Sequence, residues 1–397
     1  MKITGIKLYG VSAGESGERG AAEGESQYWG VWWTANTLIS CPMSVHPKYS
    51  KTRTSWMGPG QDPYVIEILT DEGVSGFAAN YGGGPFSCAV IDQHFRRFLI
   101  GQDPLNIELI WDQMERSTMP YGLGGVVGMA MSGVDLALWD LAGKALNVPV
   151  YKLLGGQTKD SIPCYVTTHP DCAEHWRDRG FFGLKIAAPW GVESGLEGIL
   201  KMEDLVGRLR RDVGDNMELM VDSYLSWDIE FTLRVAERVR DFGVKWFEDP
   251  LPNGWATDGN KFLRDKLAPI QLGTGNLEFH YKAFAEILAN KATDIIQPEI
   301  AWCGGLTAVR RIAAMAKPQN IPVIPHCAGV YNYHFVMSNT NSPYAEFISV
   351  GDGTEVRPIF SVLENEPLPV NGHVSLDPDL PGFGVELNRD LLVSYKG

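Results

Sequence analysis

The chain has 397 residues, of which 44% are hydrophobic and 21% charged, and its formal net charge at pH 7 is −14. This length exceeds one ordinary compact core and suits two domains, one of them the size of a barrel of about 250 residues. So acidic a surface repels phosphate backbones, so nucleic acid is not an expected partner. If the substrate is an anion, the site must supply local positive charge, and a divalent cation does so compactly.

Targeting and redox signals predict a cytoplasmic protein. No apolar run reaches the roughly 18 residues of a membrane span, so we expect no membrane partner. The first residues lead straight into a strand-like pattern, without the basic and apolar regions of a signal peptide. The six cysteines have no paired spacing, which favours reduced thiols over disulfides or a thiolate metal site.

Residues 1–125 predict an N-terminal α+β domain. Two of its strand patterns are joined by a turn that contains Gly73, which is typical of a hairpin. Two helical patterns follow the hairpin. The predicted elements are strands at 3–11, 64–69 and 74–78 and helices at 90–98 and 105–117.

Strand and helix patterns alternate from residue 126 to residue 360. The eight strand-like runs are separated by gaps that mostly fit one βα unit each, and eight such units form a closed parallel barrel. Between 228 and 242 the apolar residues recur every three or four positions, and Gly243 ends this helix. The last segment, 361–397, loses the alternation and is predicted to pack on the first domain. The predicted strands are 162–168, 183–187, 218–222, 245–248, 271–275, 294–298, 323–326 and 345–348.

Three neighbouring predicted strands finish with hard oxygen ligands. The third ends at Asp222, the fourth reaches Glu248, and Asn276 follows the fifth. The C-terminal ends of barrel strands meet at one face, where the chemistry of this fold takes place, so these groups should converge. Two carboxylates and one amide oxygen suit Mg²⁺. Each residue alone is equally typical of a surface acid or a helix cap, but three successive strand ends argue against that interpretation.

A carboxylate and a histidine end the next two strands. Glu299 follows the sixth strand and His326 ends the seventh. A carboxylate that fixes the tautomer of an imidazole and raises its basicity makes an acid–base dyad. Further candidates are Glu346 in the eighth strand, Lys185 near the end of the second, and Arg53, a cation of the first domain suited to clamping a carboxylate.

This set of residues suits removal of a proton from the carbon next to a carboxylate. The resulting enediolate carries two negative charges and is very unfavourable in water. A metal at the carboxylate offsets that charge, and a histidine of near-neutral pKa takes the proton. The fate of the enediolate then decides the reaction: reprotonation, cycloisomerisation or loss of a β-hydroxyl.

Several motifs resemble the mandelate racemase branch of the enolase superfamily, and within it the L-rhamnonate dehydratase subgroup. The resemblance covers nearly the whole chain. Its motifs are PMS (42–44), SGVDLALWDL (132–141), PVYKLLGG (149–156), DSYLS (222–226), IQP (296–298) with WCGG (302–305), PH (325–326) with VY (330–331), and PGFGVELN (381–388).

The resemblance implies a modified (β/α)7β barrel with an α+β capping domain, one Mg²⁺ and a homo-oligomer. It assigns Asp222, Glu248 and Asn276 to the metal and His326 with Glu299 to the dyad. His326 would abstract the C2 proton and protonate the departing 3-hydroxyl, which gives a 2-keto-3-deoxy acid. The residues implied to hold the substrate are Arg53, Lys185 and Glu346.

Four departures from the subgroup concern these positions. Asn276 stands where the subgroup has a glutamate, and Glu299 is one methylene longer than the usual aspartate. The second strand has Lys185 without a second lysine base, which disfavours two-base racemisation. A first-domain histidine of the subgroup is replaced within 28–33, where Trp32 and Trp33 would shrink the distal pocket. We therefore hypothesise a shorter acid such as L-lyxonate in place of L-rhamnonate, with Trp33 as a substrate contact.

Three other functions remain open from the sequence. Epimerisation or cycloisomerisation keeps the enediolate and changes only its fate. A catalytically inactive sugar-acid-binding protein is suggested by Asn276. A Schiff-base aldolase would use Lys185 as its nucleophile.

Overall fold

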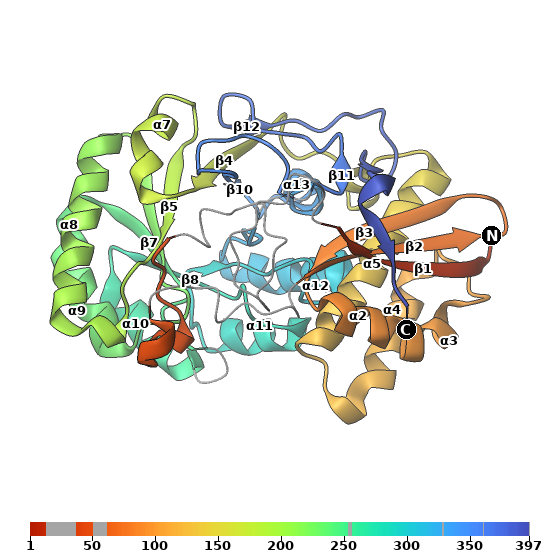
Figure 1. Cartoon of the computed structure of the whole chain (residues 1–397), viewed down its shortest axis with the longest axis horizontal. Helices are drawn as coiled ribbons and strands as arrows, with labels where there is room; N and C mark the ends of the chain where they lie inside the picture. The colour runs from red at the N-terminus through yellow and green to blue at the C-terminus, as the bar shows by residue number, and fades with distance from the viewer. Residues whose placement is uncertain (13–36, 51–61, 253–255, 328, 360, 397) are drawn as a thin grey trace.

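The protein consists of an antiparallel sheet with helices at one end and a curved parallel sheet with helices at the other (Figure 1). The structure is a computed structural model that describes residues 1–12, 37–50, 62–252, 256–327, 329–359 and 361–396. The fold predicted from the sequence, a (β/α) barrel with an α+β capping domain, is confirmed.

The capping sheet has the strand order β14-β1-β2-β3, and all its pairs are antiparallel. The predicted first strand and the hairpin are therefore confirmed. Seven of the eight residues of β2 are buried, because β2 is central in the sheet and α5 packs against it. The strands are β1 (Ile3–Val11), β2 (Pro63–Thr70), β3 (Ser75–Tyr81) and β14 (Leu392–Ser394).

One predicted helix of the capping domain lies close to its predicted position, and the other begins earlier than predicted. The region predicted as one helix at 90–98 is a composite: α2 (Gly84–Val90), a π-helical turn (Ile91–Phe95) and α3 (Arg96–Leu99). Proline in the first turn of α2 sets its earlier start, since proline is tolerated there. The predicted helix at 105–117 is α4 (Ile107–Thr118).

The longest helix of the described chain, α5 (Val126–Leu146), joins the two halves of the fold. By length and composition it could cross a membrane, but 94% of its most apolar window is buried inside the protein. It packs against β3 and against α12 (Gly305–Ala316). The apolar composition of α5 thus reflects burial between two layers of one fold. The domain boundary at residue 126 stays a prediction, and α5, which begins there, contacts the capping sheet.

Seven parallel strands form the barrel sheet in the order β10-β4-β5-β6-β7-β8-β9. The predicted strand at 323–326 is wrong as a strand: only Val323 makes a bridge, to Ile296. Pro322 and Pro325 flank this bridge and lack the N–H groups that a ladder needs. The strands are β4 (Ile162–Thr167), β5 (Gly183–Ala187), β6 (Glu218–Asp222), β7 (Val244–Glu248), β8 (Gln271–Thr274), β9 (Ile295–Ile296) and β10 (Ala345–Ile348).

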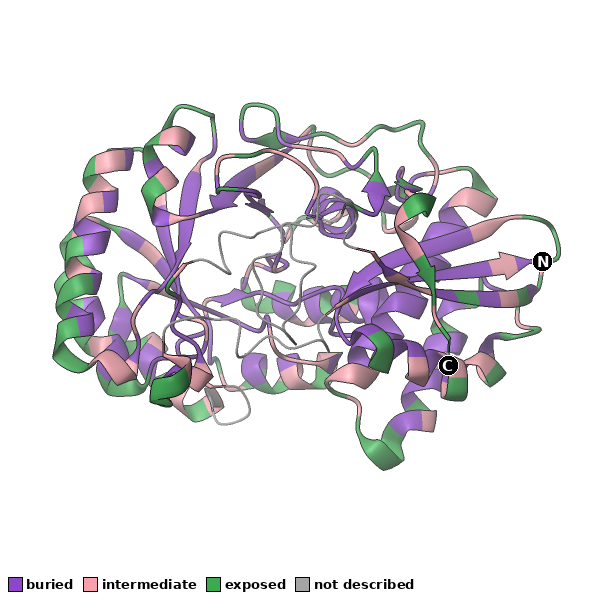
Figure 2. Ribbon diagram, in the orientation of Figure 1, coloured by how far each residue is buried: buried purple, intermediate pink, exposed green. Residues whose placement is uncertain are grey.

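Helices cover the outside of the parallel strands, with their inner faces buried and their outer faces exposed, except for α13, which is buried along nearly its whole length (Figure 2). In α9 the Asp228 side chain accepts a hydrogen bond from the Phe231 N–H (2.7 Å) and caps the helix. Gly243 has φ 65°, the left-handed conformation predicted for the end of this helix. The outer helices are α7 (Ala173–Arg177), α8 (Gly195–Val213), α9 (Ile229–Val239), α10 (Ala256–Leu267), α11 (His280–Ala289), α12, and α13 (Val330–Ser338).

The C-terminal segment contacts both halves of the fold. Its strand β12 (His373–Val374) pairs with β4 of the barrel, and β14 pairs with β1 of the capping sheet. The intervening β13 (Glu386–Leu387) pairs with β11 (Leu363–Glu364). The predicted return of the tail to the first domain is therefore confirmed.

Asp140 of α5 ties three segments together from a buried position. Its carboxylate accepts hydrogen bonds from the N–H groups of Phe77 in β3 (3.0 Å) and Phe383 in the tail (3.1 Å). It also forms an ion pair with Lys144 (2.5 Å) one turn along the helix. One side chain thus satisfies backbone donors of the capping sheet and of the tail.

Replacing Asp140 with alanine should lower the free energy of unfolding by about 3–5 kcal/mol, because it leaves buried donors and a cation without their acceptor. The measurement is urea unfolding followed by circular dichroism. The matched control is Asp112→Ala, since Asp112 forms the same i,i+4 pair with Arg116 on an exposed face. That change should cost less than about 1 kcal/mol. Equal losses for the two variants would contradict this account of Asp140.

Candidate active site

Charged side chains from adjacent strands meet at the carboxyl end of the barrel sheet. Asp222 and Glu248 are the last residues of β6 and β7 and are direct partners in the parallel register. Lys185 lies in β5 and Glu346 in β10, on either side of β4. All four side chains are at most 3% exposed. Of the three strand ends predicted to converge, those of Asp222 and Glu248 are observed to do so, and Lys185 and Glu346 lie with them.

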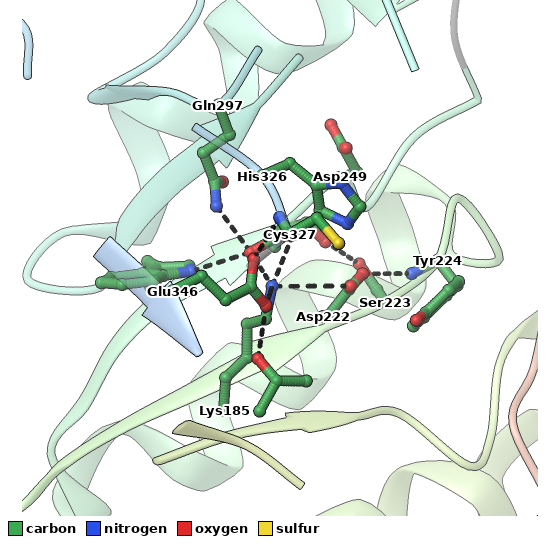
Figure 3. A network of polar contacts seen from close by, with 12 residues as sticks. Lys185, Asp222, Ser223, Tyr224, Asp249, Gln297, His326, Cys327 and Glu346 are labelled. Carbon is green, nitrogen blue, oxygen red and sulfur yellow. Dashed lines mark hydrogen bonds and ion pairs between the residues drawn. The ribbon is translucent and has the colours of Figure 1, made fainter. Parts of the chain in front are cut away.

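The Lys185 ammonium group lies among three carboxylates (Figure 3). Its Nζ is 2.9 and 3.0 Å from the two oxygens of Glu248 and 2.9 Å from Oε1 of Glu346. The nearest oxygen of Asp222 is 3.9 Å away. Burial lowers the pKa of Lys185, but the charges of Glu248 and Glu346 outweigh it and raise the pKa well above its usual value. The amine is therefore protonated, which argues against the nucleophile of a Schiff-base aldolase.

Asn276 lies just past β8 and is the third predicted metal ligand. It is 7% exposed, and its Oδ1 has no hydrogen-bond donor among the described residues. A buried carbonyl oxygen without a donor is costly unless a ligand or water completes it. No group of three His, Cys, Asp or Glu side chains in the described part of the chain is arranged to hold a metal ion. An amide oxygen is a hard donor of the kind that Mg²⁺ accepts, so the chemistry of Asn276 fits the role of third ligand beside two carboxylates.

Charge counting indicates the kind of ion that suits the cluster. Asp222, Glu248 and Glu346 against Lys185 leave two negative charges unmatched if all four groups are ionised. Burial and the nearby charge of Glu248 raise the pKa of Asp222 to about 8, so the ionised cluster lacks positive charge. A divalent cation supplies the missing charge, and the oxygen donors suit a hard one. The residues present thus fit a divalent metal.

The predicted dyad is formed. Nδ1 of His326 is 2.8 Å from Oε2 of Glu299, and the other oxygen of Glu299 accepts a hydrogen bond from the N–H of Ala301 (2.9 Å). Glu299 is 1% exposed, whereas the His326 side chain is 15% exposed. Because Nδ1 faces the carboxylate, Nε2 is the nitrogen left to exchange a proton with a substrate. Burial lowers the pKa of His326, but the hydrogen bond to Glu299 and the charge of Glu346 outweigh it and raise the pKa to about 9.

Glu346 is fully engaged by protein donors. Oε1 accepts a hydrogen bond from the Thr167 hydroxyl (2.5 Å) besides its contact with Lys185, and Oε2 accepts one from the Cys327 N–H (2.7 Å). These contacts, with the charge of Lys185, hold the pKa of Glu346 below its usual value despite the opposing effect of burial. The predicted contact of Glu346 and Lys185 with substrate stays a prediction. Arg53 and Trp33, the other two predicted substrate contacts, lie outside the described residues.

Two residues that the sequence did not single out support the acidic cluster. The Gln297 amide donates to Oε2 of Glu248 (2.7 Å). Asp249 accepts hydrogen bonds from the Thr274 hydroxyl and from the N–H of Gly275 (3.2 Å), and so joins the end of β7 to the loop that carries Asn276. The sequence did contain a pattern that could have identified Gln297. It stands two positions before Glu299, which is the spacing of residues on one face of a strand.

The capping sheet holds the loop that carries Glu299. Asn80, in β3, donates its amide to the carbonyl oxygen of Ala301 (2.8 Å). The indole N–H of Trp302 donates to the carbonyl oxygen of Tyr81 (2.8 Å), and the Trp302 ring lies 6.3 Å from the ring of His326. Gly82 follows Tyr81, and a Cβ atom there would lie 2.5 Å from the indole nitrogen of Trp302. Glycine is therefore required for the capping sheet to approach this loop.

Two family models together match most of the chain. The model described as "Mandelate racemase / muconate lactonizing enzyme, N-terminal domain" matches residues 43–155, and the model "Enolase C-terminal domain-like" matches residues 170–391. The first match begins before β2 and ends after α5, and the second covers the parallel strands from β5 onward and most of the tail. Both halves of the observed fold are thus accounted for.

Individual relatives agree with the family models. A putative L-rhamnonate dehydratase from Caldivirga maquilingensis is 38% identical over 359 residues, which span 89% of this chain and 88% of the relative. The crystal structure of L-rhamnonate dehydratase from Gibberella zeae has a TM-score of 0.90 at 34% identity and covers 99% of this chain and 96% of that chain. A structure of the Gibberella zeae enzyme complexed with Mg covers the same shares, with a TM-score of 0.90 at 35% identity. The chain therefore belongs to the mandelate racemase branch of the enolase superfamily and is a rhamnonate dehydratase-like hydro-lyase.

Proposed function

We propose that the protein dehydrates an acid sugar, by removal of the C2 proton and loss of the 3-hydroxyl, to a 2-keto-3-deoxy acid. The observation that carries this proposal is the His326–Glu299 dyad at the same end of the barrel as the buried acidic cluster. The L-rhamnonate dehydratases to which the chain is similar support the same class of reaction.

We assign the metal site to Asp222, Glu248 and Asn276, with Mg²⁺ as the ion. The donors are hard oxygens, the orphaned amide oxygen of Asn276 gains a partner, and the unmatched charge of the cluster is satisfied. The Mg complex of the Gibberella zeae relative supports the choice of ion. When bound, the cation offsets the negative charge that develops on the substrate carboxylate.

The dyad supplies the proton transfers. Glu299 accepts the Nδ1–H hydrogen bond, so Nε2 carries the lone pair that takes the C2 proton. The electron pair of the broken C–H bond forms the C1–C2 double bond of the enediolate. The imidazolium then returns its proton to the 3-hydroxyl as the C3–O bond breaks, and water leaves. The enol that remains tautomerises to the 2-keto acid.

The residues described around the cluster favour dehydration over epimerisation. Epimerisation by two bases needs a second base on the opposite face of C2. Lys185 is the lysine of β5, and its ammonium is held by Glu248 and Glu346 at 2.9 Å, which keeps it charged. A charged ammonium cannot accept a proton, whereas His326 becomes deprotonated as the pH rises through its pKa of about 9, so His326 is the base that this cluster offers.

For the substrate we propose L-lyxonate, or an acid that shares its stereochemistry at C2 to C4. The support is in the sequence, where two tryptophans, Trp32 and Trp33, replace a segment that holds a histidine in the L-rhamnonate dehydratase subgroup. Bulky indoles leave less room at the distal end of a substrate, which favours a five-carbon acid over a six-carbon one.

A substrate screen tests the proposed reaction. Purified protein with Mg²⁺ should convert at least one aldonic acid to a product that semicarbazide detects as a 2-keto acid, with five-carbon acids preferred. His326→Asn should lower kcat by at least about 10²-fold, since it removes the base. Turnover of six-carbon acids alone would reject L-lyxonate. An epimer as product, or tight binding of one acid without turnover, would reject dehydration.

Replacing Lys185 with methionine should make the melting temperature depend more strongly on Mg²⁺. Without the ammonium, three buried carboxylates are left together, so the melting temperature of the metal-free protein should fall. Mg²⁺ should then raise the melting temperature more in the variant than in the wild type. The control is Lys245→Met, since Lys245 pairs with Glu218 at the other end of the neighbouring strands, away from the cluster. An Mg²⁺-induced rise equal in all three proteins would contradict the assigned site.

Glu299→Gln should move the pH profile toward acid. A base is active when deprotonated, so the rate rises with pH through the pKa of His326. The charge of Glu299 stabilises the imidazolium and helps raise its pKa to about 9, and a neutral amide removes this stabilisation. The ascending limb of kcat/KM against pH should therefore lie at lower pH in the variant, with a lower plateau. A limb that stays in place would show that Glu299 does not set the basicity of His326.

A further inference from the structure

The backbone next to His326 has an unusual conformation. Cys327, the following residue, has φ 69°, in the left-handed region that is costly for a residue with a side chain, about 1–3 kcal/mol. Such a conformation persists only where surrounding groups hold it. The direction of the His326 side chain depends on this turn, so the groups that hold the turn also orient the imidazole.

Four polar groups of the turn have identified partners. The N–H of His326 donates to the carbonyl oxygen of Pro298 (3.0 Å), and the N–H of Cys327 donates to Oε2 of Glu346 (2.7 Å). The two carbonyl oxygens, of His326 and of Cys327, both accept from the side-chain amide of Asn332, at 2.7 and 2.6 Å. A single side chain thus holds the two peptide units on either side of the left-handed torsion angles.

Asn332 is itself fixed. It is the third residue of α13 and is 4% exposed. The first N–H of this helix, that of Val330, donates to Oε1 of the buried Glu366 in the C-terminal segment (2.8 Å). The helix start is thus anchored by a separate carboxylate, and the Asn332 amide is available to the turn.

We propose that Asn332 is a positioning residue for His326, and that its two hydrogen bonds hold the turn in which the imidazole meets Glu299. Only the expected effect on kcat rests on the proposed function; the expected effect on the position of His326 does not. Asn332 acts through the backbone of His326 and not through the substrate, so its loss should lower kcat with little change in KM. A misplacement of a reacting group by about 1 Å can cost about 100-fold in rate.

Asn332→Asp separates this role from support of the helix. An ionised aspartate has the shape of asparagine but donates no hydrogen bond, so it repels both carbonyl groups. At the third position of a helix a carboxylate is favourable, because it faces the positive end of the helix dipole. The start of α13 should therefore survive the change while the turn is lost. Asn332→Ala removes the donors without adding charge and serves if the aspartate variant does not fold.

Kinetics and NMR of the full chain test the proposal. In Asn332→Asp or Asn332→Ala we expect kcat to fall 10- to 100-fold with KM within threefold. We also expect the low-field proton signal of His326 Nδ1–H, assigned by its loss in His326→Asn, to shift or disappear. The matched control is Asn339→Asp at the other end of α13, where the Asn339 amide donates to Ser342 and accepts from the N–H of Asn341, away from His326. This control should leave the signal and kcat unchanged even if it lowers the melting temperature.

The outcomes separate the two proposals. An unchanged signal with kcat within twofold of the wild type would overturn the role of Asn332, as would a loss of kcat that follows the melting temperature in both the Asn332 and the Asn339 variants. If the wild type converts no acid sugar, the proposed function fails. The NMR comparison still decides whether Asn332 positions His326, because it needs no substrate.

Discussion

The buried ammonium of Lys185 is the contact on which the arrangement of the acidic cluster depends. Three carboxylates cannot share a buried space in ionised form without positive charge, and the pKa of Asp222 is already raised by burial and by Glu248. Lys185 binds Glu248 and Glu346 within 3.0 Å and lies 3.9 Å from Asp222. It thereby pre-organises the strand ends. The negative charge that remains unmatched favours the binding of a divalent cation.

The same end of the barrel depends on the capping sheet for the geometry of its acid–base pair. The loop after Glu299 receives a hydrogen bond from Asn80 and gives one to Tyr81 through Trp302, both at 2.8 Å. These contacts come from the end of β3, a strand of the antiparallel sheet. The Glu299 carboxylate is thus carried by the barrel and held in place by the other half of the fold, and α5 and the tail also join the two halves.

The sequence was sufficient to predict most strands and the cluster, because residues at the ends of parallel strands converge whatever the loops do. It failed at 323–326, where prolines remove ladder donors from an apolar run that otherwise has the composition of a strand. It also gave no sign that both oxygens of Glu346 are taken by Thr167, Lys185 and the Cys327 N–H. Contacts of this kind depend on register and on side-chain direction across strands, which composition and spacing do not specify.

Glu299, which is one methylene longer than an aspartate would be, is held by two hydrogen bonds. Its carboxylate has to reach the Nδ1 of His326 with one oxygen while the other oxygen accepts the N–H of Ala301, two residues further along the same loop. A longer side chain has more rotamers to lose, so it needs more contacts to be held in one geometry. The bond to Ala301 and the backbone turn from Trp302 to Glu299 (3.0 Å) provide them. The Nδ1–carboxylate contact is therefore restrained by a loop on the Glu299 side and by a turn on the His326 side.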